Sequence, residues 1–397
     1  MSDLRQRALD YHQFPKPGKI SVESSKPCAT QDDLSLAYTP GVAEPVREIH
    51  ADPANAYKYT NKGNLVAVIT DGTAVLGLGN MGALASKPVM EGKGILFKRF
   101  AGIDVFDIEI NASSPDEFIQ TVVNIAPTFG GINLEDIAAP HCFYIENELK
   151  KRLDIPVFHD DQHGTAVIVA AALLNALEIQ GKTLPTAKIV FLGAGAAGCS
   201  CAKLLKLMGA TNITMTDRTG VLDTNRPDLH DNNRELAVAA SSAKTLADVM
   251  PNADVFVGVS AKNALDADLI KSMAKNPIIF ALANPDPEVL PSVAHAIRDD
   301  ILMATGRSDF PNQVNNALCF PYLFRGALDA KARQITEEMK VAAAMALSEL
   351  AREPVPADVL KAYNLTELEF GKDYIIPKPF DTRLLERVSS AVAKAAK

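Results

Sequence analysis

The sequence predicts an α/β protein of two domains, each built around a sheet of parallel strands. Two observations predict this class. Short runs of apolar, β-branched residues lie between turn residues along the chain, as is typical of strands that are buried on both faces. Segments with helical spacing follow these runs, and strands that alternate with helices form parallel βα units. The length of 397 residues is sufficient for two or three domains, each with its own core.

The first series of elements follows a short helix and a loop rich in Pro and Ser within residues 1–60. Residues 114–126 are predicted to be helical, because they open with Ser114, a favourable N-cap, and then have helical spacing. The predicted strands and strand ends of this series are residues 64–70, 103–110, 133–138 and 155–161.

The second series begins with a long helix over residues 163–180, which Gly181 ends. A further helix is predicted over 196–209, and the end of the chain is helical. We therefore predict a first domain over residues 1–160 and a second over 161–397, with the C-terminal helix packing back on the first domain. The predicted strands of the second series are residues 187–193, 212–217, 253–259, 277–285 and 301–307.

The composition excludes several classes of protein. The chain has 40 Lys and Arg against 48 Asp and Glu, which disfavours a nucleic-acid-binding surface because phosphates are neutralised by clustered basic residues. No apolar run approaches the roughly 18 residues of a membrane span, and the polar start lacks the apolar segment of a secretion signal. The five cysteines are odd in number and lie in apolar or helical surroundings, which favours reduced thiols. We expect a cytoplasmic protein without nucleic-acid or membrane partners.

A glycine-rich turn in the second series has the pattern of a dinucleotide-binding fingerprint. It follows a strand, opens a helix, and precedes a strand that ends in Asp217, near the spacing of about 20 residues expected for the acid that binds the ribose. Its backbone and the helix N-terminus suit a pyrophosphate. The pattern predicts a Rossmann-like, doubly wound parallel sheet that binds NAD or NADP. Asp217 favours NAD, whereas the neighbouring Arg218 is of the type that accommodates the 2′-phosphate of NADP, so both stay open. The predicted cofactor-binding residues are Gly193, Ala194, Gly195, Ala196, Ala197, Gly198 and Asp217.

A second match to the same glycine spacing, at Gly77, Gly79 and Gly82, is a weaker candidate. It is offset from its preceding strand, and Pro88 interrupts the helix that follows. We therefore do not predict a dinucleotide at this turn.

Four carboxylates follow strands of the first series. Glu135 and Asp136 are adjacent at one strand end, and Asp160 and Asp161 lie just before the long helix. Carboxylates without cysteine ligands suit hard cations such as Mg²⁺ or Mn²⁺. The alternatives are that Asp161 is a helix N-cap and that the first pair forms a solvated turn. Two histidines beside the second pair are candidate ligands or hydrogen-bonded structural residues: His159 and His163.

Four further side chains are candidates for chemistry. Lys93 lies between two glycines before an apolar run, where desolvation or a nearby cation would lower its pKa towards neutrality and make it a base; a surface lysine is the alternative. Tyr38 precedes a proline turn that would present its hydroxyl rigidly, unless it is a core aromatic. Asn284 ends a strand of the second sheet, and Asn316 follows a polar loop; each is otherwise a turn residue.

Seven motifs in one order identify a family resemblance. They are AYTPGVAEP, TDGTAVLGLGNMG, KPVMEGKGILFK, NLEDI, HDDQHGTA, LGAGAAG and GRSDFPNQVNNA. Together they resemble the malic enzymes, specifically the short bacterial type, from about residue 10 to the end of the chain. The resemblance implies oxidative decarboxylation of L-malate to pyruvate and CO₂, with reduction of NAD or NADP and a requirement for Mg²⁺ or Mn²⁺.

The resemblance also implies roles for individual residues. The family's metal ligands match Glu135, Asp136 and Asp161. The remaining roles are general acid for Tyr38, general base and substrate contact for Lys93, orientation of that base for Asp160, and contacts with substrate and nicotinamide for Asn284 and Asn316. One position departs from the longer malic enzymes, in which an arginine clamps a malate carboxylate: here it is Ala74.

Other properties of the family are expectations for this chain. Its members are generally homodimers or larger oligomers, and some continue into a phosphotransacetylase-like domain. Two other functions stay open from the sequence. One is a hydroxy-acid dehydrogenase that does not decarboxylate its substrate, and the other is a nucleotide-binding regulatory module without turnover.

Overall fold

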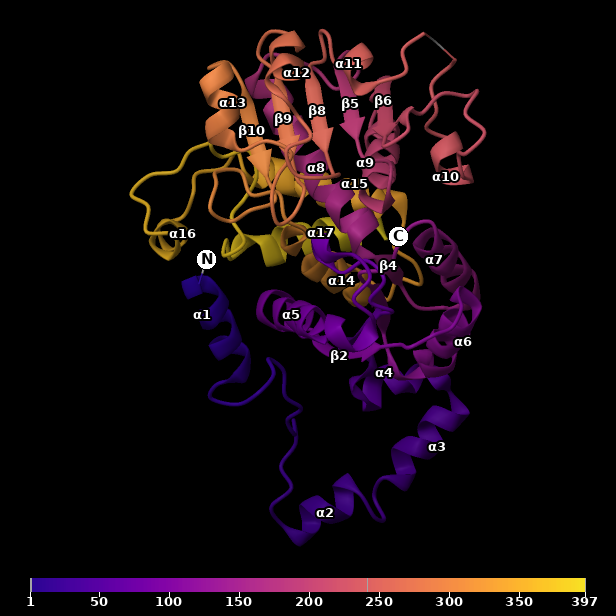
Figure 1. Cartoon of the computed structure of the whole chain (residues 1–397). Coiled ribbons are helices and arrows are strands. Elements are labelled where there is room, and N and C mark those ends of the chain that lie inside the picture. Colours follow the sequence, from indigo (N-terminus) through magenta and orange to yellow (C-terminus); the bar gives the residue numbers. More distant parts are fainter. Residues whose placement is uncertain (1, 241, 397) are drawn as a thin grey trace.

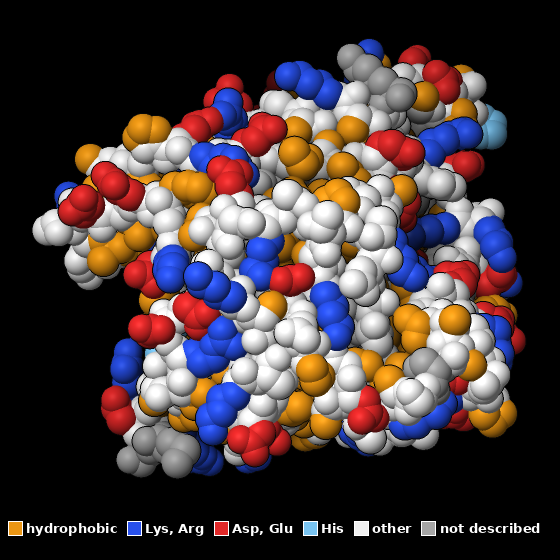
Figure 2. All heavy atoms as spheres, turned by 90° about the horizontal axis from the view of Figure 1, so that it is seen from above, with side chains coloured by type: hydrophobic (Ala, Val, Ile, Leu, Met, Phe, Trp, Pro, Cys, Tyr) orange, Lys and Arg blue, Asp and Glu red, His pale blue; other side chains and the backbone are white. Residues whose placement is uncertain are grey.

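The computed structural model describes residues 2–240 and 242–396. It contains two sheets, stacked one above the other in Figure 1 and flanked by helices, which confirms the predicted α/β class. On the face seen from above, acidic and basic side chains are interspersed (Figure 2). This face offers no continuous basic surface of the kind that nucleic acids require.

The first sheet has four strands in the order β2-β1-β3-β4, all parallel. Every residue of β1 is buried, as the continuous apolar run predicted. The register pairs Ile69 with Leu134 and Leu134 with His159, so that the carboxyl ends of β1, β3 and β4 meet at one edge. The strands are β1 (Leu65–Thr70), β2 (Asp104–Glu109), β3 (Gly131–Leu134) and β4 (Val157–His159), and the helices of this part are α5 (Ala83–Ala101), α6 (Pro115–Ile125) and α7 (His141–Arg152).

The second sheet has six strands in the order β10-β9-β8-β5-β6-β7, parallel except for β7. Its central strand β5 separates β6 from β8, which makes the carboxyl end of β5 the switch point where doubly wound sheets bind ligands. The strands are β5 (Lys188–Leu192), β6 (Asn212–Asp217), β7 (Gly220–Val221), β8 (Val255–Gly258), β9 (Ile278–Ala281) and β10 (Leu302–Thr305). The helices are α8 (Asp160–Ile179), α9 (Ala196–Leu207), α10 (Asp231–Arg234), α11 (Leu246–Val249), α12 (Ala267–Ser272) and α13 (Pro291–Ile297).

The sequence did not predict β7 or α10, which lie within the polar segment 218–235. Both are very short, and β7 is an antiparallel extension that pairs with the end of β6. Local pattern therefore carries almost no signal for either element.

The C-terminal helices α14, α15 and α17 lie below the second sheet in Figure 1, between this sheet and the first part of the chain. α14 packs on α5 of the first part of the chain, and its Phe324 ring lies 5.3 Å from Phe97 and 5.8 Å from Phe158. The last helix, α17, packs instead against α14 and α15. The helix that packs back on the first part of the chain is thus α14 and not the last helix, α17. The domain boundary at residue 160 remains a prediction. The helices are α14 (Phe320–Asp329), α15 (Glu337–Leu350), α16 (Ala357–Ala362) and α17 (Arg383–Ala395).

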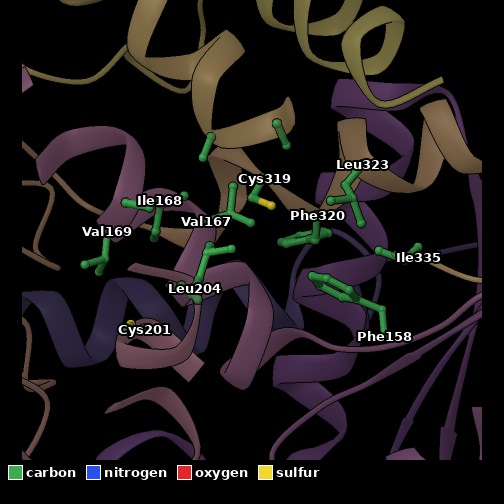
Figure 3. Packing of buried hydrophobic residues seen from close by; sticks show 14 of the residues in the cluster. Phe158, Val167, Ile168, Val169, Cys201, Leu204, Cys319, Phe320, Leu323 and Ile335 are labelled. Atoms are coloured by element: carbon green, nitrogen blue, oxygen red, sulfur yellow. The ribbon is translucent and has the colours of Figure 1, made fainter. Parts of the chain in front are cut away.

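One hydrophobic cluster is shared by both parts of the chain. It contains strand residues of both sheets together with residues of α8, α9 and α14, some of which are shown in Figure 3. Within the described part of the chain, α8 alone is long and apolar enough to cross a membrane, but 72% of that apolar window is buried inside the protein. α8 is therefore the core helix of this cluster.

An arm of the N-terminal region projects away from this core (Figure 1). It includes two helices in which no residue is buried, α2 and α3. Both ends of the arm are attached to the body of the molecule, where the backbone N–H of Lys19 donates to Glu91 of α5 at 2.9 Å and the Lys62 ammonium donates to the Pro127 carbonyl at 2.9 Å. The helices of this region are α1 (Ser2–Gln13), α2 (Gln31–Ala37), α3 (Ala43–Ala51) and α4 (Ala56–Tyr59), and its 3₁₀ turns are η1 (Pro53–Asn55) and η2 (Asn61–Asn64). Further 3₁₀ turns along the chain are η3 (Leu76–Leu78), η4 (Ala126–Thr128) and η5 (Asn316–Leu318).

Candidate active site

The four predicted carboxylates come together because two parallel strands end side by side. Glu135 and Asp136 follow the last residue of β3, while Asp160 and Asp161 open α8 directly after β4. Asp136 has a φ of 54°, a left-handed conformation that is uncommon outside glycine. This turn directs its backbone N–H towards Asp161, whose Oδ2 accepts it at 2.8 Å.

Three of these carboxylates form a cluster with the dimensions of a cation site. Ligand oxygens of Glu135, Asp136 and Asp161 lie within 4.8 Å of one another, and Glu135 and Asp136 are buried. The Oδ2 atom of Asp136 is buried and has no hydrogen-bond partner. The interpretation of a solvated turn is therefore wrong. The N-cap interpretation is wrong as well, because Asp161 accepts from a different segment rather than from its own helix.

The electrostatics of this cluster favour a bound cation. Burial raises the pKa of Glu135 to about 7 and that of Asp161 to about 6. Burial and the neighbouring Glu135 charge raise the pKa of Asp136 to about 8. The positive charge that the chain places around these three acids is thus insufficient to keep their pKa values at the ordinary level. Hard oxygen donors with an unsatisfied oxygen among them fit Mg²⁺ or Mn²⁺.

Lys93 lies on α5 with its ammonium directed into this group of acids. It is 8% exposed, its Nζ lies 3.0 Å from Glu135 Oε1, and it donates a hydrogen bond to Asp160. The Phe320 ring covers it, with the Nζ 4.5 Å from the ring centroid. Lys93 is therefore buried beside the carboxylates, and the surface-lysine alternative is wrong.

The charge state of Lys93 differs from the prediction. Burial acts to lower its pKa, but the charges of Asp160, Glu135 and Asp161 outweigh burial, so the pKa of Lys93 is raised. The expectation that its surroundings bring the pKa towards neutrality is wrong for the chain without a cation. The prediction considered burial and a nearby cation, and it did not count the charges of the acids that contact the amine.

Asp160 is the acid most enclosed by the protein. It is fully buried, one of its oxygens binds Lys93 and the other, Oδ1, has no partner; burial raises the pKa of Asp160 to about 7. A Cβ atom at Gly164, one turn along α8, would lie 1.8 Å from that Oδ1 and 3.2 Å from the Cβ of Asn316. The absence of a side chain at Gly164 therefore allows Asn316 to lie beside the Lys93–Asp160 pair.

Asn284 reaches the same region from the second sheet. It follows β9, and a Cβ atom at Gly77 would lie 2.0 Å from the Asn284 carbonyl oxygen. The loop after β1 is thus in contact with the loop after β9. The loop after β1 also lines the carboxylate cluster, since the backbone N–H of Ala74 donates to the Asp136 carbonyl at 2.9 Å. The weaker glycine match therefore belongs to the mouth of this site, and the Ala74 methyl group offers no charge to a carboxylate.

The fingerprint glycines lie at the switch point of the second sheet. Gly193 follows β5 and α9 opens at Ala196, as the sequence predicted. Asp217 ends β6, but its carboxylate is already paired: it accepts from two nitrogens of Arg226, both at 2.8 Å, and from the backbone N–H groups of Thr219 and Gly220. Arg218 is exposed beside it. The acid expected to bind a ribose is therefore neutralised by an arginine that the sequence did not single out.

The two histidines differ in how they lie relative to the cation cluster. His163 bonds to Glu146 at 2.9 Å and lies near Lys340, which confirms the structural alternative for His163. His159 is buried, its Nε2 lies 3.8 Å from Asp161 Oδ2, and neither of its ring nitrogens has a hydrogen-bond partner, so the hydrogen-bonded alternative is not met for His159. Burial lowers the pKa of His159 to about 4. A cavity of about 420 Å³ is lined by residues of α7, α8 and α9, among them His163 and Ser200, and not by Lys93 or the four acids.

Tyr38 lies apart from Lys93 and the four acids. It ends α2 at the outer end of the arm (Figure 1), and it is 69% exposed. The core alternative for Tyr38 is wrong, and within a single chain Tyr38 does not meet Lys93.

Three residues of the site were missed by the sequence analysis. Asn133 donates to Glu135 Oε2 at 3.0 Å, Phe320 covers Lys93, and Arg226 pairs with Asp217. Asn133 is a polar residue inside an apolar strand, and this was an available signal. Phe320 and Arg226 lie in a helix and a polar loop without any distinguishing pattern.

Comparison with known proteins gives a consistent result over the whole chain. The family model described as malic enzyme, N-terminal domain, matches residues 17–150, and the one described as malic enzyme, NAD binding domain, matches residues 162–362. The NADP-dependent malic enzyme of Halomonas elongata is 61% identical over 394 residues, which cover 99% of this chain and 93% of that protein. The NADP-dependent malic enzyme of Escherichia coli is 56% identical, and this chain spans 52% of its length.

Solved structures agree with this result. The malic enzyme of Pyrococcus horikoshii superposes with a TM-score of 0.90 at 43% identity, covering 99% of this chain and 90% of that chain. The NAD-dependent malic enzyme of Thermotoga maritima gives a TM-score of 0.88 at 42% identity, covering 97% and 98%.

The cation site leads to a first prediction. Replacing Asp136→Asn removes a charged ligand whose Oδ2 has no protein partner, and we expect Mn²⁺ binding to weaken by at least about tenfold. Isothermal titration of Mn²⁺ into the purified protein measures the change. Asp154→Asn, an exposed acid outside the cluster, is the matched control and should bind Mn²⁺ like the unmodified chain. Equal affinities for the two variants would contradict the site.

Proposed function

This chain belongs to the malic enzyme family, and we propose that its site on β3, β4 and α8 oxidatively decarboxylates L-malate to pyruvate and CO₂ with reduction of NAD or NADP. The observation that carries the proposal is the buried ammonium of Lys93 between Glu135 and Asp160, beside a three-carboxylate cluster. A proton-transfer group and a cation site side by side suit a substrate that must lose both a hydroxyl proton and a carboxylate.

The cofactor and the cation supply one part of the chemistry, and the side chains of the protein supply another. When bound, the nicotinamide accepts the hydride from malate C2, and a divalent cation held by Glu135, Asp136 and Asp161 supplies Lewis-acid stabilisation of the enolate as the C3–C4 bond breaks. The protein positions the substrate and manages its protons. Lys93 takes the proton of the C2 hydroxyl once its own ammonium has released a proton, and the Asp160 carboxylate in contact with it is the acceptor that the geometry offers.

The surroundings of Lys93 support this role. Phe320 covers the amine with an aromatic ring, and α14 brings this ring from the C-terminal part of the chain. Water is thereby excluded from one side of Lys93, which strengthens its interactions with charged partners. Asn316 and Asn284, which approach from η5 and from the end of β9, are proposed to contact the substrate and the nicotinamide.

An assay of the reaction products tests the function. The protein is incubated with L-malate and Mn²⁺ with either NAD or NADP, and each reaction is repeated with EDTA. We expect reduced cofactor together with pyruvate, and loss of both with EDTA. Oxaloacetate in place of pyruvate would instead support a dehydrogenase that does not decarboxylate, and no reduction of either cofactor would support a regulatory module.

A substitution of the base gives a sharper prediction. Lys93→Ala removes the proton acceptor, so we expect kcat for malate oxidation to fall by at least about 10²-fold, the usual contribution of general acid–base catalysis. Cofactor binding, followed by fluorescence of bound NADPH, should be unchanged because Lys93 lies on α5 and not at the fingerprint. Lys98→Ala on the exposed side of the same helix is the control and should keep full activity. Normal turnover of the Lys93→Ala variant would remove Lys93 from the mechanism.

We propose that NADP is the preferred cofactor of this chain. Arg226 already neutralises Asp217, so the carboxylate that would repel a 2′-phosphate has lost most of its effect. Arg218 lies exposed beside it. The name NADP-dependent malic enzyme is also given to relatives at 56–61% identity, although a Rhizobium meliloti relative at 55% is named NAD-dependent.

The preference is tested by Arg218→Ala. Removing a cation that bonds to a phosphate should raise the KM for NADP by about tenfold or more, as expected for hydrogen bonds to charged groups, and leave the KM for NAD unchanged. Arg333→Ala, another exposed arginine, controls for loss of charge in general. An equal change for both cofactors would contradict the proposed 2′-phosphate contact.

Two broader features are also proposed. We place the domain boundary at residue 160, where α8 begins, and the gap between the two family matches supports this position. A cytoplasmic location is supported by the five cysteines, all of which are free thiols.

A further inference from the structure

We propose that the cavity lined by residues of α7, α8 and α9 binds a small phosphate monoester, and that its occupant is coupled to the carboxylate cluster through Glu146. The cavity has a volume of about 420 Å³, which is in the range of sites for small molecules. Among the described residues, its lining includes neither Lys93 and the four acids nor the fingerprint residues 193–198, so it is distinct from the candidate active site. Binding in the cavity does not depend on the proposed function, and the coupling concerns cation binding rather than turnover.

The cavity lies where the two parts of the chain meet. α7 belongs to the first series of elements, α8 and α9 belong to the second, and α10 and α15 contribute further lining residues. The helices α7, α9 and α10 lie towards the right of Figure 1. Small-molecule sites occur preferentially at such junctions between domains. A molecule bound there would contact both parts of the chain at once.

The strong bases of the cavity are lysines. Lys150, Lys203 and Lys340 line it, and no arginine is among the lining residues that the structure describes. A planar guanidinium group matches a carboxylate through two parallel hydrogen bonds, whereas lysine binds a phosphate as a point charge. A phosphate monoester has a charge of about −1.5 to −2 at neutral pH and three oxygens that accept hydrogen bonds. It therefore suits three ammonium groups that come from three different helices.

Lys340 is a buried positive charge that the chain neutralises incompletely. Its side chain is 2% exposed, whereas its carboxylate partner, Glu337, is 57% exposed. The Lys340 ammonium also lies 3.2 Å from His163 Nδ1. Burial lowers the pKa of Lys340, and the Glu337 charge does not fully offset this effect. An anion in the cavity would supply the missing negative charge.

Lys203 is available to the same anion. It forms an ion pair with Glu235 at 2.6 Å and donates a hydrogen bond to Asn232 at 3.0 Å. Glu235 is exposed, and an ion pair with an exposed carboxylate contributes little free energy because water screens it. Exchange of Glu235 for a phosphate therefore costs Lys203 little.

Part of the lining is apolar and indicates that the ligand has a carbon chain. Phe143, Leu204 and Leu207 belong to this part. Inorganic phosphate would leave these side chains in contact with water, whereas the carbon chain of a monoester would cover them. Asn147 and Ser200 line the same cavity and offer hydrogen bonds to hydroxyl groups of that chain.

Glu146 of α7 links the cavity to the acids of the candidate active site. Its buried carboxylate accepts from the backbone N–H of His159 at 3.2 Å and lies 2.9 Å from His163 Nε2. These two histidines flank Asp160 and Asp161 in the sequence. Glu146 therefore holds the chain on both sides of these two acids.

The lysines of the cavity contact the same groups. Lys150 lies 2.7 Å from Glu146, and Lys340 contacts His163. A phosphate that attracts either lysine therefore alters the contacts that hold the first turn of α8. Since this turn carries acids of the active site, the affinity for a cation changes when the cavity is occupied. By linkage, a bound cation changes the affinity of the cavity for its ligand by the same factor.

Isothermal titration with glycerol 2-phosphate tests the site. The titration uses the whole chain without cofactor or divalent cation, and we expect one molecule to bind per chain. Lys203→Ala and Lys340→Met each remove one cation from the cavity, so binding should weaken by about tenfold or more. Lys206→Ala, at an exposed lysine of α9 outside the lining, is the control and should bind like the unmodified chain.

The two variants protect the test against a failure to fold. Lys340 is buried and its replacement is checked by circular dichroism, whereas Lys203 reaches the solvent and its replacement leaves the core intact. Absence of binding to the unmodified chain would overturn the proposal. Equal affinities for Lys203→Ala and Lys206→Ala would overturn it as well.

Further probes identify the class of ligand. Inorganic phosphate lacks the carbon chain and succinate lacks the phosphate, so both should bind more weakly than glycerol 2-phosphate. Tighter binding of succinate would overturn the assignment to phosphate monoesters. Displacement of glycerol 2-phosphate by NADP would also overturn it, because the probe would then occupy the cofactor site.

The coupling is measured by titrating Mn²⁺ with and without glycerol 2-phosphate, at a concentration that saturates the unmodified chain but not the Lys203→Ala variant. We expect the dissociation constant of Mn²⁺ to change by about fivefold or more in the unmodified chain, as is typical of coupled sites. The Lys203→Ala variant in the same solutions corrects for Mn²⁺ bound by free phosphate monoester. An equal change in both chains would overturn the coupling. Neither titration requires turnover, so a failure of the proposed function would leave both results unaffected.

Discussion

The structure depends on the meeting of Lys93 with four acids at the ends of two parallel strands. Glu135, Asp136, Asp160 and Asp161 gather there because β3 and β4 are neighbours and point the same way. One buried ammonium cannot neutralise four carboxylates, and burial of unpaired charge is costly. The N-terminus of α8 contributes a partial positive charge to Asp160 and Asp161. The remaining excess of negative charge favours a small, highly charged cation.

This constraint explains why distant parts of the chain are interleaved. Lys93 comes from α5, the acids come from the ends of β3 and β4, and the aromatic cover comes from α14 near the C-terminus. A single hydrophobic cluster joins these elements, and the aromatic rings of Phe97, Phe158 and Phe324 form part of it. The polar site is thus held in position by an apolar network that neither domain completes alone.

Much of this organisation was predictable, for identifiable reasons. Strand ends are visible in a sequence because apolar runs give way to polar residues, and parallel pairing then brings Glu135 and Asp160 to one edge. The fingerprint at Gly193 was predictable because its geometry is local. Contacts across the fold were not: the sequence does not show that Arg226 occupies Asp217, or that acids around Lys93 raise its pKa. The position of Tyr38 on an exposed arm was missed because a motif identifies a residue type and does not show where the fold places that residue.

The helix α8 has a mechanical consequence. It opens in the carboxylate site and is 20 residues long, which corresponds to roughly 30 Å. Towards its far end, Asn175 donates to the carbonyls of Ser348 and Ile375, and Gln180 donates to those of Pro277 and Asp300. A hinge rotation of one sheet against the other would have to bend this helix or break those bonds.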